Sequence, residues 1–159
     1  CTGPDGVEKW SDSFHNLVVN QGLQDMNDKY FKASGYTAVW YLGLVTGPGS
    51  GTTYAAGDTL SSHAGWTENT AYSQTTRPAC SFGTATTANP SVISNTSSAA
   101  TFSINGTATI AGAFLTTSNT KSGTTGTLFS AASFSSPGDR AVVSGDTLTV
   151  TYTFSLTGT

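Results

Sequence analysis

The chain has 159 residues and a formal net charge of −3, a length that suits one domain with a core of its own. Only 9% of the residues are charged, whereas Thr and Ser together number 50. Because a β-branched Thr suits a pleated strand better than a helix, the composition predicts a mainly β protein. Only six residues are Lys or Arg and they form no basic cluster, which argues against a nucleic-acid partner.

The sequence also argues against a membrane partner and a zinc site. No run of about 18 apolar residues is present to span a membrane and no basic, apolar leader opens the chain, so we expect a soluble chain. Cys1 and Cys80 are the only cysteines, too few for a zinc site or a disulfide framework. An initial Cys fits a processed lipoprotein or a piece of a longer chain, and the turn-like residues 2–6 favour the second.

The N-terminal part carries a helical pattern. Apolar residues recur with an imperfect helical spacing over residues 11–31, Ser11 or Asp12 can cap the start, and Gly35 lies beyond the end. This pattern predicts a helix over residues 11–31, with a partly ordered arm as the alternative. The apolar residues are Phe14, Leu17, Val18, Leu23, Met26 and Tyr30.

Beyond residue 35 the pattern becomes that of β-strands. The β-branched and aromatic run at 36–47 predicts a strand covered on both faces, and strict alternation of apolar residues with Thr or Ser at 147–156 predicts a half-buried strand. The Ser/Thr-rich segment 84–98 is interpreted as a loop, and the Ile-Asn-Gly-Thr sequence at 104–107 as a hairpin turn. Weaker strand patterns occur at 79–84, 99–105, 107–116, 126–134 and 140–144.

These elements predict a fold class and a division of the chain. Several short strands after a single helix indicate an antiparallel β-sandwich or jelly roll with one N-terminal helix or arm. Eight of the fifteen charged residues precede residue 33. We therefore expect an N-terminal arm and helix over residues 1–35 and a β-sandwich domain over residues 36–159.

The stretch 58–78 gathers ionisable residues around one of the two histidines, so we considered it as an active site. A hydrolase needs a general base, an orienting carboxylate and a nucleophile, and the loop offers His63, then Asp58 or Glu68, then Ser61 or Ser62. No exposed-nucleophile motif accompanies them. His15 and His63 lie too far apart in sequence for a metal site, and the acidic residues are too sparse for a calcium loop.

A structural role for this loop is the favoured interpretation. Trp66 and Tyr72 anchor the loop in the core, and Gly65 permits an unusual backbone angle beside the tryptophan. His63 is then a polar fixture. Arg77 pairs with one of the two carboxylates, Asp58 or Glu68. We expect no catalytic, metal-binding or cofactor-binding residue.

Carbohydrate binding is another alternative, because β-domains often stack aromatic rings against sugars. The candidates are Trp40, Tyr41, Trp66 and Tyr72. Large aromatic residues in a small domain more often pack in the core, and this is the outcome we expect for these four.

Two blocks of sequence are not explained by composition: SSHAGWTE at 61–68 and GAFLTTSNTKSGTTGTL at 112–128. Together with NLVVNQGLQDMNDKYF at 16–31, WYLGLV at 40–45 and VVSGDTLTVTYTFSL at 142–156, they give the chain a resemblance that extends from Asn16 nearly to its end. In these stretches the chain resembles a family of small virion structural proteins of tailed double-stranded DNA bacteriophages.

The resemblance implies a non-enzymatic protein of the phage particle without a cofactor. The expected role is a decoration or cement protein on the outer surface of the head, which binds the major capsid protein and stabilises the shell. The alternative is a head- or tail-fibre component that binds a host-surface glycan. Capsid symmetry further implies self-association as a dimer or trimer.

The charge-rich N-terminal segment is the expected docking element for the capsid. Charge distribution alone motivates this hypothesis, because the charged residues concentrate before residue 33. The apolar residues expected to take part are Trp10, Phe14, Leu17, Val18, Met26 and Tyr30.

Overall fold

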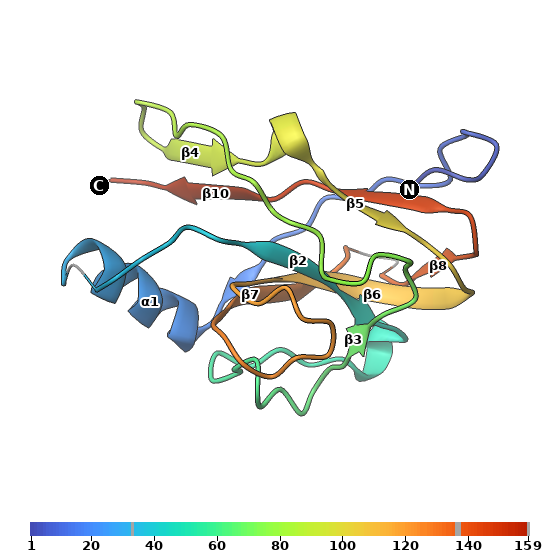
Figure 1. Ribbon diagram of the computed structural model, residues 1–159, viewed down its shortest axis with the longest axis horizontal. Coiled ribbons are helices and arrows are strands. Elements are labelled where there is room, and N and C mark those ends of the chain that lie inside the picture. The colour runs from blue at the N-terminus through green and yellow to red at the C-terminus, as the bar shows by residue number, and fades with distance from the viewer. Residues whose placement is uncertain (33, 136–137, 159) are drawn as a thin grey trace.

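The computed structural model describes residues 1–32, 34–135 and 138–158, which form antiparallel sheets and one N-terminal helix (Figure 1). The mainly β prediction is thereby confirmed, including the antiparallel pairing and the helix. The helix α1 spans Asn20–Tyr30, and two short 3-10 helices span Gly49–Gly51 (η1) and Thr96–Ser98 (η2). The strands are β1 (Leu17–Val18), β2 (Tyr41–Thr46), β3 (Glu68–Asn69), β4 (Ser91–Ser94), β5 (Ala100–Ser103), β6 (Ala108–Thr116), β7 (Leu128–Ser133), β8 (Arg140–Val142), β9 (Thr147–Val150) and β10 (Thr153–Leu156).

The main sheet has the order β1-β7-β6-β2-β3, and β8 also pairs with β6. Its central strand β6 is buried from Ile110 to its end, because side chains cover the sheet on both faces. Leu42 and Leu44 of β2 point to one core cluster, whereas Val45 joins the other. The near-continuous apolar run is therefore a strand covered on both faces, as predicted, although it begins at Tyr41 and not at residue 36.

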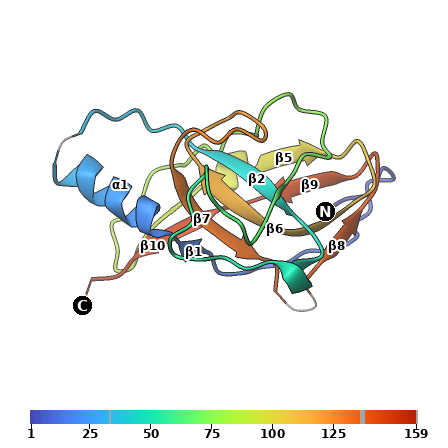
Figure 2. The ribbon, with the colours of Figure 1, turned by 90° about the horizontal axis from the view of Figure 1, so that it is seen from below.

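Two separate pairs of strands, β5–β9 and β4–β10, lie over one face of the main sheet (Figures 1 and 2). The larger core cluster fills the space between these layers, with Phe102 and Leu148 from the pair β5–β9 and Ile110 and Leu115 from β6. The β-sandwich or jelly roll is not confirmed, because the strands opposite the main sheet form two pairs instead of one continuous sheet.

The alternating C-terminal segment is two strands and not one. Leu148 and Tyr152 are buried while Thr149 and Thr151 are exposed, so the predicted alternation is correct there, but Leu156 at the end of the segment is 55% exposed. Asn95, which is fully buried, interrupts the pairing because its side-chain oxygen accepts the N–H of Tyr152 at 2.6 Å. On either side of this point β9 pairs with β5, and β10 pairs with β4.

Three local predictions were wrong in detail because tertiary pairing decided them. The link at 104–107 joins the two layers and forms no hairpin, since β5 pairs with β9 while β6 pairs with β2, β7 and β8. Residues 79–84 make a single bridge between Ala79 and Tyr41 and no longer strand. The expected loop 84–98 contains β4, which finds its partner in β10.

The helix begins at Asn20, so the prediction of a helix from residue 11 was wrong at its start. Val18 and Leu17 instead pair with β7 as strand β1. Upstream, Trp10 and Phe14 contact the ring of Phe134 edge-on, with centroids 5.5 and 5.1 Å away. Sheet pairing and aromatic contacts therefore take over the residues that looked like the first turns of a helix.

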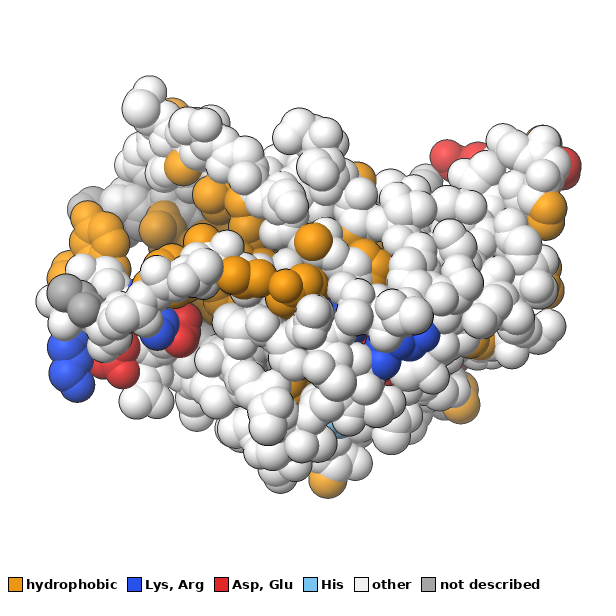
Figure 3. Space-filling model, in the orientation of Figure 1, with side chains coloured by type: hydrophobic (Ala, Val, Ile, Leu, Met, Phe, Trp, Pro, Cys, Tyr) orange, Lys and Arg blue, Asp and Glu red, His pale blue; other side chains and the backbone are white. Residues whose placement is uncertain are grey.

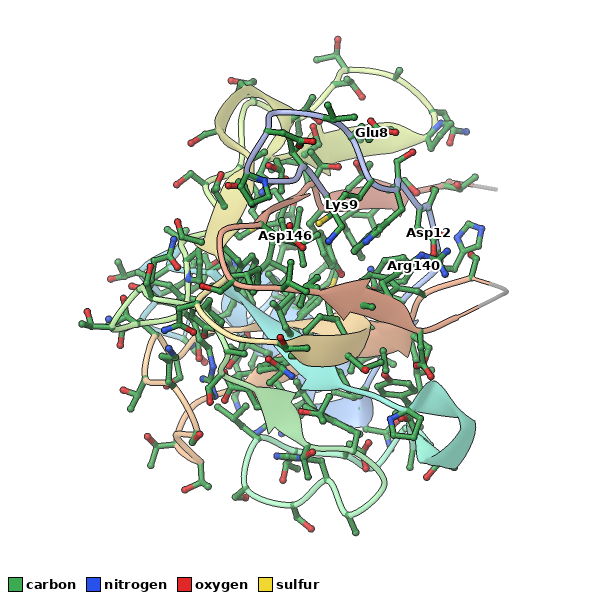
Figure 4. The ribbon with its side chains drawn as sticks, turned by 90° about the vertical axis from the view of Figure 1, so that its right-hand side faces the viewer. Glu8, Lys9, Asp12, Arg140 and Asp146 are labelled. Carbon is green, nitrogen blue, oxygen red and sulfur yellow. The ribbon has the colours of Figure 1, made fainter. Side chains whose placement is uncertain are left out.

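Ion pairs hold the segment before β1 against the C-terminal strands (Figure 4). Lys9 pairs with Asp146 in the turn before β9, and Asp12 accepts a hydrogen bond from Arg140 of β8 at 2.7 Å. In Figure 4 these partners come from opposite ends of the chain and point toward each other. The N-terminal residues are thus part of the packed body.

Candidate functional site

The first part of the sequence-predicted loop 58–78 packs against the face of the main sheet that lies opposite the two strand pairs, whereas Tyr72 belongs to the core cluster between the layers. Its Leu60 and Trp66 belong to the second core cluster, together with Val45, Ala111 and Phe114 of the sheet. A second loop, residues 117–127 between β6 and β7, lies against it. We call these two segments the two-loop cluster.

The histidine of the first loop is held by the neighbouring tryptophan. The His63 Nδ1 lies 2.9 Å from the carbonyl oxygen of Trp66, and the two rings stack with centroids 3.9 Å apart. The indole N–H of Trp66 donates to Asp58 at 3.0 Å, and the same carboxylate accepts the N–H of Ala55. Asp58 therefore orients the tryptophan and makes no hydrogen bond to His63 in the described part of the chain.

Arg77 and Glu68 form a buried, bidentate ion pair. The Arg77 Nε and Nη2 donate to the two carboxylate oxygens of Glu68 at 2.9 and 2.8 Å, and the side chains are 1% and 7% exposed. Of the two predicted partners, the arginine thus takes Glu68 and not Asp58. The guanidinium also lies 5.1 Å from the Phe114 ring, and its Nη1 donates to the carbonyl of Ser118 at 2.9 Å.

The second loop completes this arrangement, and reasoning from the sequence missed its part in the site. Ser122 has a φ of 56°, and its backbone N–H donates to Glu68 at 2.7 Å. The Lys121 ammonium donates to the carbonyls of Tyr72 and Gln74 and lies 3.8 Å from the Tyr72 ring centroid. Burial lowers the pKa of Lys121, and nearby Glu68 opposes this shift. The sequence signal that could have pointed to this loop was the block 112–128, which composition does not explain. It contacts the other such block, 61–68, through Ser122 and Glu68.

Gly65 and Tyr72 take the structural positions expected of anchors, with one correction. A Cβ on Gly65 would overlap the backbone oxygen of Thr53, so close approach and not an unusual φ requires glycine there. Tyr72 is 1% exposed and contacts Phe102 edge-on at 5.0 Å. Burial, with a contribution from Glu68, raises the pKa of its hydroxyl, which therefore stays protonated.

A cavity of about 280 Å³ lies between the loops, with His63, Trp66 and Arg77 in its wall. Catalysis by a serine nucleophile would need a hydrogen bond from Ser61 or Ser62 to the histidine. Among the described residues neither serine hydrogen-bonds to His63: the Ser61 hydroxyl lies 3.2 Å from that of Thr59, and the His63 Nδ1 contacts the carbonyl of Trp66. The contacts of the cavity wall therefore attach the two loops to each other and to the sheet.

The aromatic residues proposed for sugar stacking do not form a platform. Trp66 and Tyr72 are buried, and Trp40 and Tyr41 are half-buried. The Trp40 ring contacts Phe129 edge-on at 5.3 Å, and its N–H donates to Tyr36. The exposed large aromatic side chains within the described residues are Tyr30, Phe31 and Tyr36.

The proposed docking residues divide into two groups. Trp10, Phe14, Val18 and Met26 pack against the larger core cluster, so they hold the N-terminal segment in place. Leu17 and Tyr30 are exposed. Docking stays a prediction, and of the six proposed residues only these two have exposed side chains.

Cysteine and metal chemistry add no further site in the described residues. Burial raises the pKa of Cys80 to about 12, so its thiol stays protonated and is a poor nucleophile. No group of three or more His, Cys, Asp or Glu side chains is arranged to hold a metal ion in the described ranges. Among the same residues, no helix combines the length and the apolar character needed to cross a membrane.

Comparisons of the chain with models of protein families, with curated proteins and with solved structures found no match.

Proposed function

We propose that this protein is a non-enzymatic structural component of a bacteriophage particle, a decoration or cement protein that binds the major capsid protein on the outer surface of the head. One observation carries the proposal. The two blocks on which the resemblance chiefly rests, 61–68 and 112–128, pack together through the buried pair Arg77–Glu68 and the N–H of Ser122. Two blocks held together by buried packing contacts fit a rigid module better than an enzyme.

The state of the ionisable groups supports the same proposal. In the two-loop cluster, Asp58, His63, Glu68, Arg77 and Lys121 all make hydrogen bonds to neighbouring residues of the fold. Side chains that hydrogen-bond to the fold in this way stiffen the loops that carry them. A rigid, sparsely charged surface suits attachment by area and shape complementarity.

The copy number of the protein in purified virions tests the proposal, by quantitative mass spectrometry against the major capsid protein. A cement protein is expected near one copy per capsid subunit. Addition to undecorated capsids should then raise the temperature at which they rupture, because a ligand that binds the assembled shell favours it by mass action. Absence from the virion, or no binding to capsids, contradicts the proposal.

A few tens of copies or fewer would instead support the fibre alternative with a glycan-binding role. Leu17→Gln tests whether the N-terminal segment contacts the capsid. Val143→Gln is the matched control, because both side chains are about two-fifths exposed. Deletion of the whole segment is unsuitable, since it removes Trp10 and Phe14 from the core.

A further inference from the structure

The outer face of α1 carries no charge, which is unusual for the solvent side of a helix. Residues spaced three and four apart along this face are all exposed: Asn20, Leu23, Gln24, Asn27, Tyr30 and Phe31. Leu23 is 51% exposed, Tyr30 83% and Phe31 80%. The aromatic rings of the last two contact each other edge-on, 4.9 Å apart.

The charges of the helix lie on its other sides and interact locally. Asp25, Asp28 and Lys29 are half-buried. The Lys29 ammonium donates to the carbonyl of Gly35 at 3.0 Å, and Lys32 lies 3.9 Å from Asp28. The inner face contacts the body through Met26 and through Gly22, where a Cβ would lie 2.5 Å from the backbone oxygen of Phe129.

The position of α1 leaves its outer face open. Figures 1 and 2 both show the helix projecting from one end of the molecule, beyond the main sheet. Figure 3 shows its charged side chains low at this end, with hydrophobic side chains gathered between β10 and the segment that leads from α1 to β2.

The exposed aromatic side chains of this face supply a substantial part of the area that an interface needs. Since one aromatic side chain carries about 150–250 Å², the exposed fractions of Tyr30 and Phe31 correspond to roughly 300 Å² per copy. A stable interface buries about 800 Å² per partner, so these two side chains alone supply more than a third of it. Leu23, Gln24 and Asn27 on the same face add to this area.

We propose that the outer face of α1 binds the same face of a second copy, with the helices antiparallel across a two-fold axis at Asn27. In this arrangement position 27+n faces position 27−n. Leu23 then packs against Phe31, Gln24 against Tyr30, and each Asn27 amide faces its counterpart. A two-fold contact requires such a self-complementary surface.

The absence of charge favours a second copy over a charged partner. Burying a charged side chain against this neutral face would leave that charge without a partner, which is costly. A second copy brings only apolar and amide groups, and facing Asn side chains can bond to each other and set the register of a helix pair. This contact is one specific form of the self-association that the proposed function includes. It rests on the proposed function only in that the dimer would be used on a capsid.

Disulfide formation tests the register directly. Packed helices lie about 8–10 Å apart with Cα radii of about 2.3 Å, so facing Cα atoms at position 27 lie roughly 5 Å apart, within disulfide range. We expect Asn27→Cys in a Cys1→Ser background to form covalent dimers under mild oxidation. Asn20→Cys is the matched control on the same face, because its two copies would lie about 21 Å apart along the helices.

Sedimentation equilibrium of the full chain gives a second test, because it measures the oligomeric state directly. The unmodified protein is expected to be a dimer. The double variant Tyr30→Gln, Phe31→Gln is expected to weaken association at least tenfold. The control double variant Val7→Gln, Val143→Gln changes exposed apolar sites elsewhere and should leave association unchanged. A monomeric protein, equal crosslinking at positions 20 and 27, or a dimer that resists the double substitution overturns this inference. Capsid binding by a monomer would leave the proposed function standing.

Discussion

The buried pair of Arg77 and Glu68 is the residue-scale feature on which the two-loop cluster depends. Each partner is nearly inaccessible to water, so each charge relies on the other and on backbone groups for compensation. The carbonyls of Ser118 and Gly123 accept from the guanidinium, and the N–H of Ser122 donates to the carboxylate. The pair therefore joins three segments of the chain.

Replacement of Arg77 by Met should destabilise the protein strongly. Removing one partner leaves Glu68 buried without compensation, a change that costs about 3–5 kcal/mol. The free energy of unfolding from urea titration measures the effect. Lys32→Met is the control, since the Lys32–Asp28 pair is exposed and such pairs contribute about 0–1 kcal/mol. A loss below about 1 kcal/mol for the Arg77 variant would show that the pair is not important for stability.

At the scale of elements, α1 is positioned by its single glycine. Glycine inside a helix is unfavourable by about 1 kcal/mol relative to Ala, yet Gly22 is buried, and a Cβ there would lie 2.5 Å from the backbone oxygen of Phe129. Close contact between α1 and β7 therefore explains a residue that the helical pattern alone does not favour. A bulkier residue has to push the helix away from the sheet.

Gly22→Ala is expected to destabilise the protein by about 1–3 kcal/mol, because overpacking against backbone outweighs the gain in helix propensity. Asp25→Ala in the same helix is the control, because the Asp25 side chain makes no hydrogen bond or ion pair among the described residues and lies outside the proposed dimer face. It raises helix propensity without a new contact and should stabilise slightly. Thermal unfolding of both variants measures the difference, and an unchanged or raised midpoint for Gly22→Ala would contradict the packing argument.

For the whole molecule, the junction of the chain ends is the feature that closes the fold. The backbone of Thr2 pairs with Thr147 in both directions at 2.8 Å, and Lys9 bonds to Asp146, which is 1% exposed. Burial alone would raise the pKa of Asp146. The bond from Lys9 and the backbone N–H of Val143 outweigh it and leave that pKa below its ordinary value of 3.8.

This junction should make the free energy of unfolding depend on pH in the acid range. A carboxyl whose pKa is depressed by folding contributes stability above its unfolded pKa and loses it as the pH falls through the folded value. The contribution of Asp146 is therefore expected to be complete above about pH 4 and to fade below it. Urea unfolding of the protein and of Asp146→Asn from pH 7 to pH 2.5 should show curves that differ at neutral pH and converge in acid. A constant difference would exclude this origin.

Much of the fold follows from local pattern, because patterns of period two depend on which side of a strand faces the core. The run at Tyr41–Thr46 and the alternation from Leu148 to Tyr152 were predictable for this reason. The conformation of the residues before α1 was not predictable in this way. Val18 and Phe14 fit a helical spacing, but pairing with β7 and contact with Phe134 determine their conformation.

The candidate site was predicted in its first half only. Trp66, Tyr72 and the pairing of Arg77 with an acidic residue follow from residue type, since large aromatics anchor loops and a buried guanidinium needs a carboxylate. The choice of Glu68 over Asp58, and the part played by Ser122, depend on a loop some fifty positions away in the chain, which no local pattern specifies.

The sequence by itself determined that this protein is mainly β, where its clearest strands lie and that Trp66 and Tyr72 lie in its core, because hydrophobic period and residue shape act locally. Tertiary structure alone decided the pairing of β4 with β10, the division of the last strand at Asn95, and the packing of the N-terminal segment against the C-terminal strands. These outcomes depend on contacts between residues far apart in the chain, and the free energy of such contacts exists only once the layers are packed together.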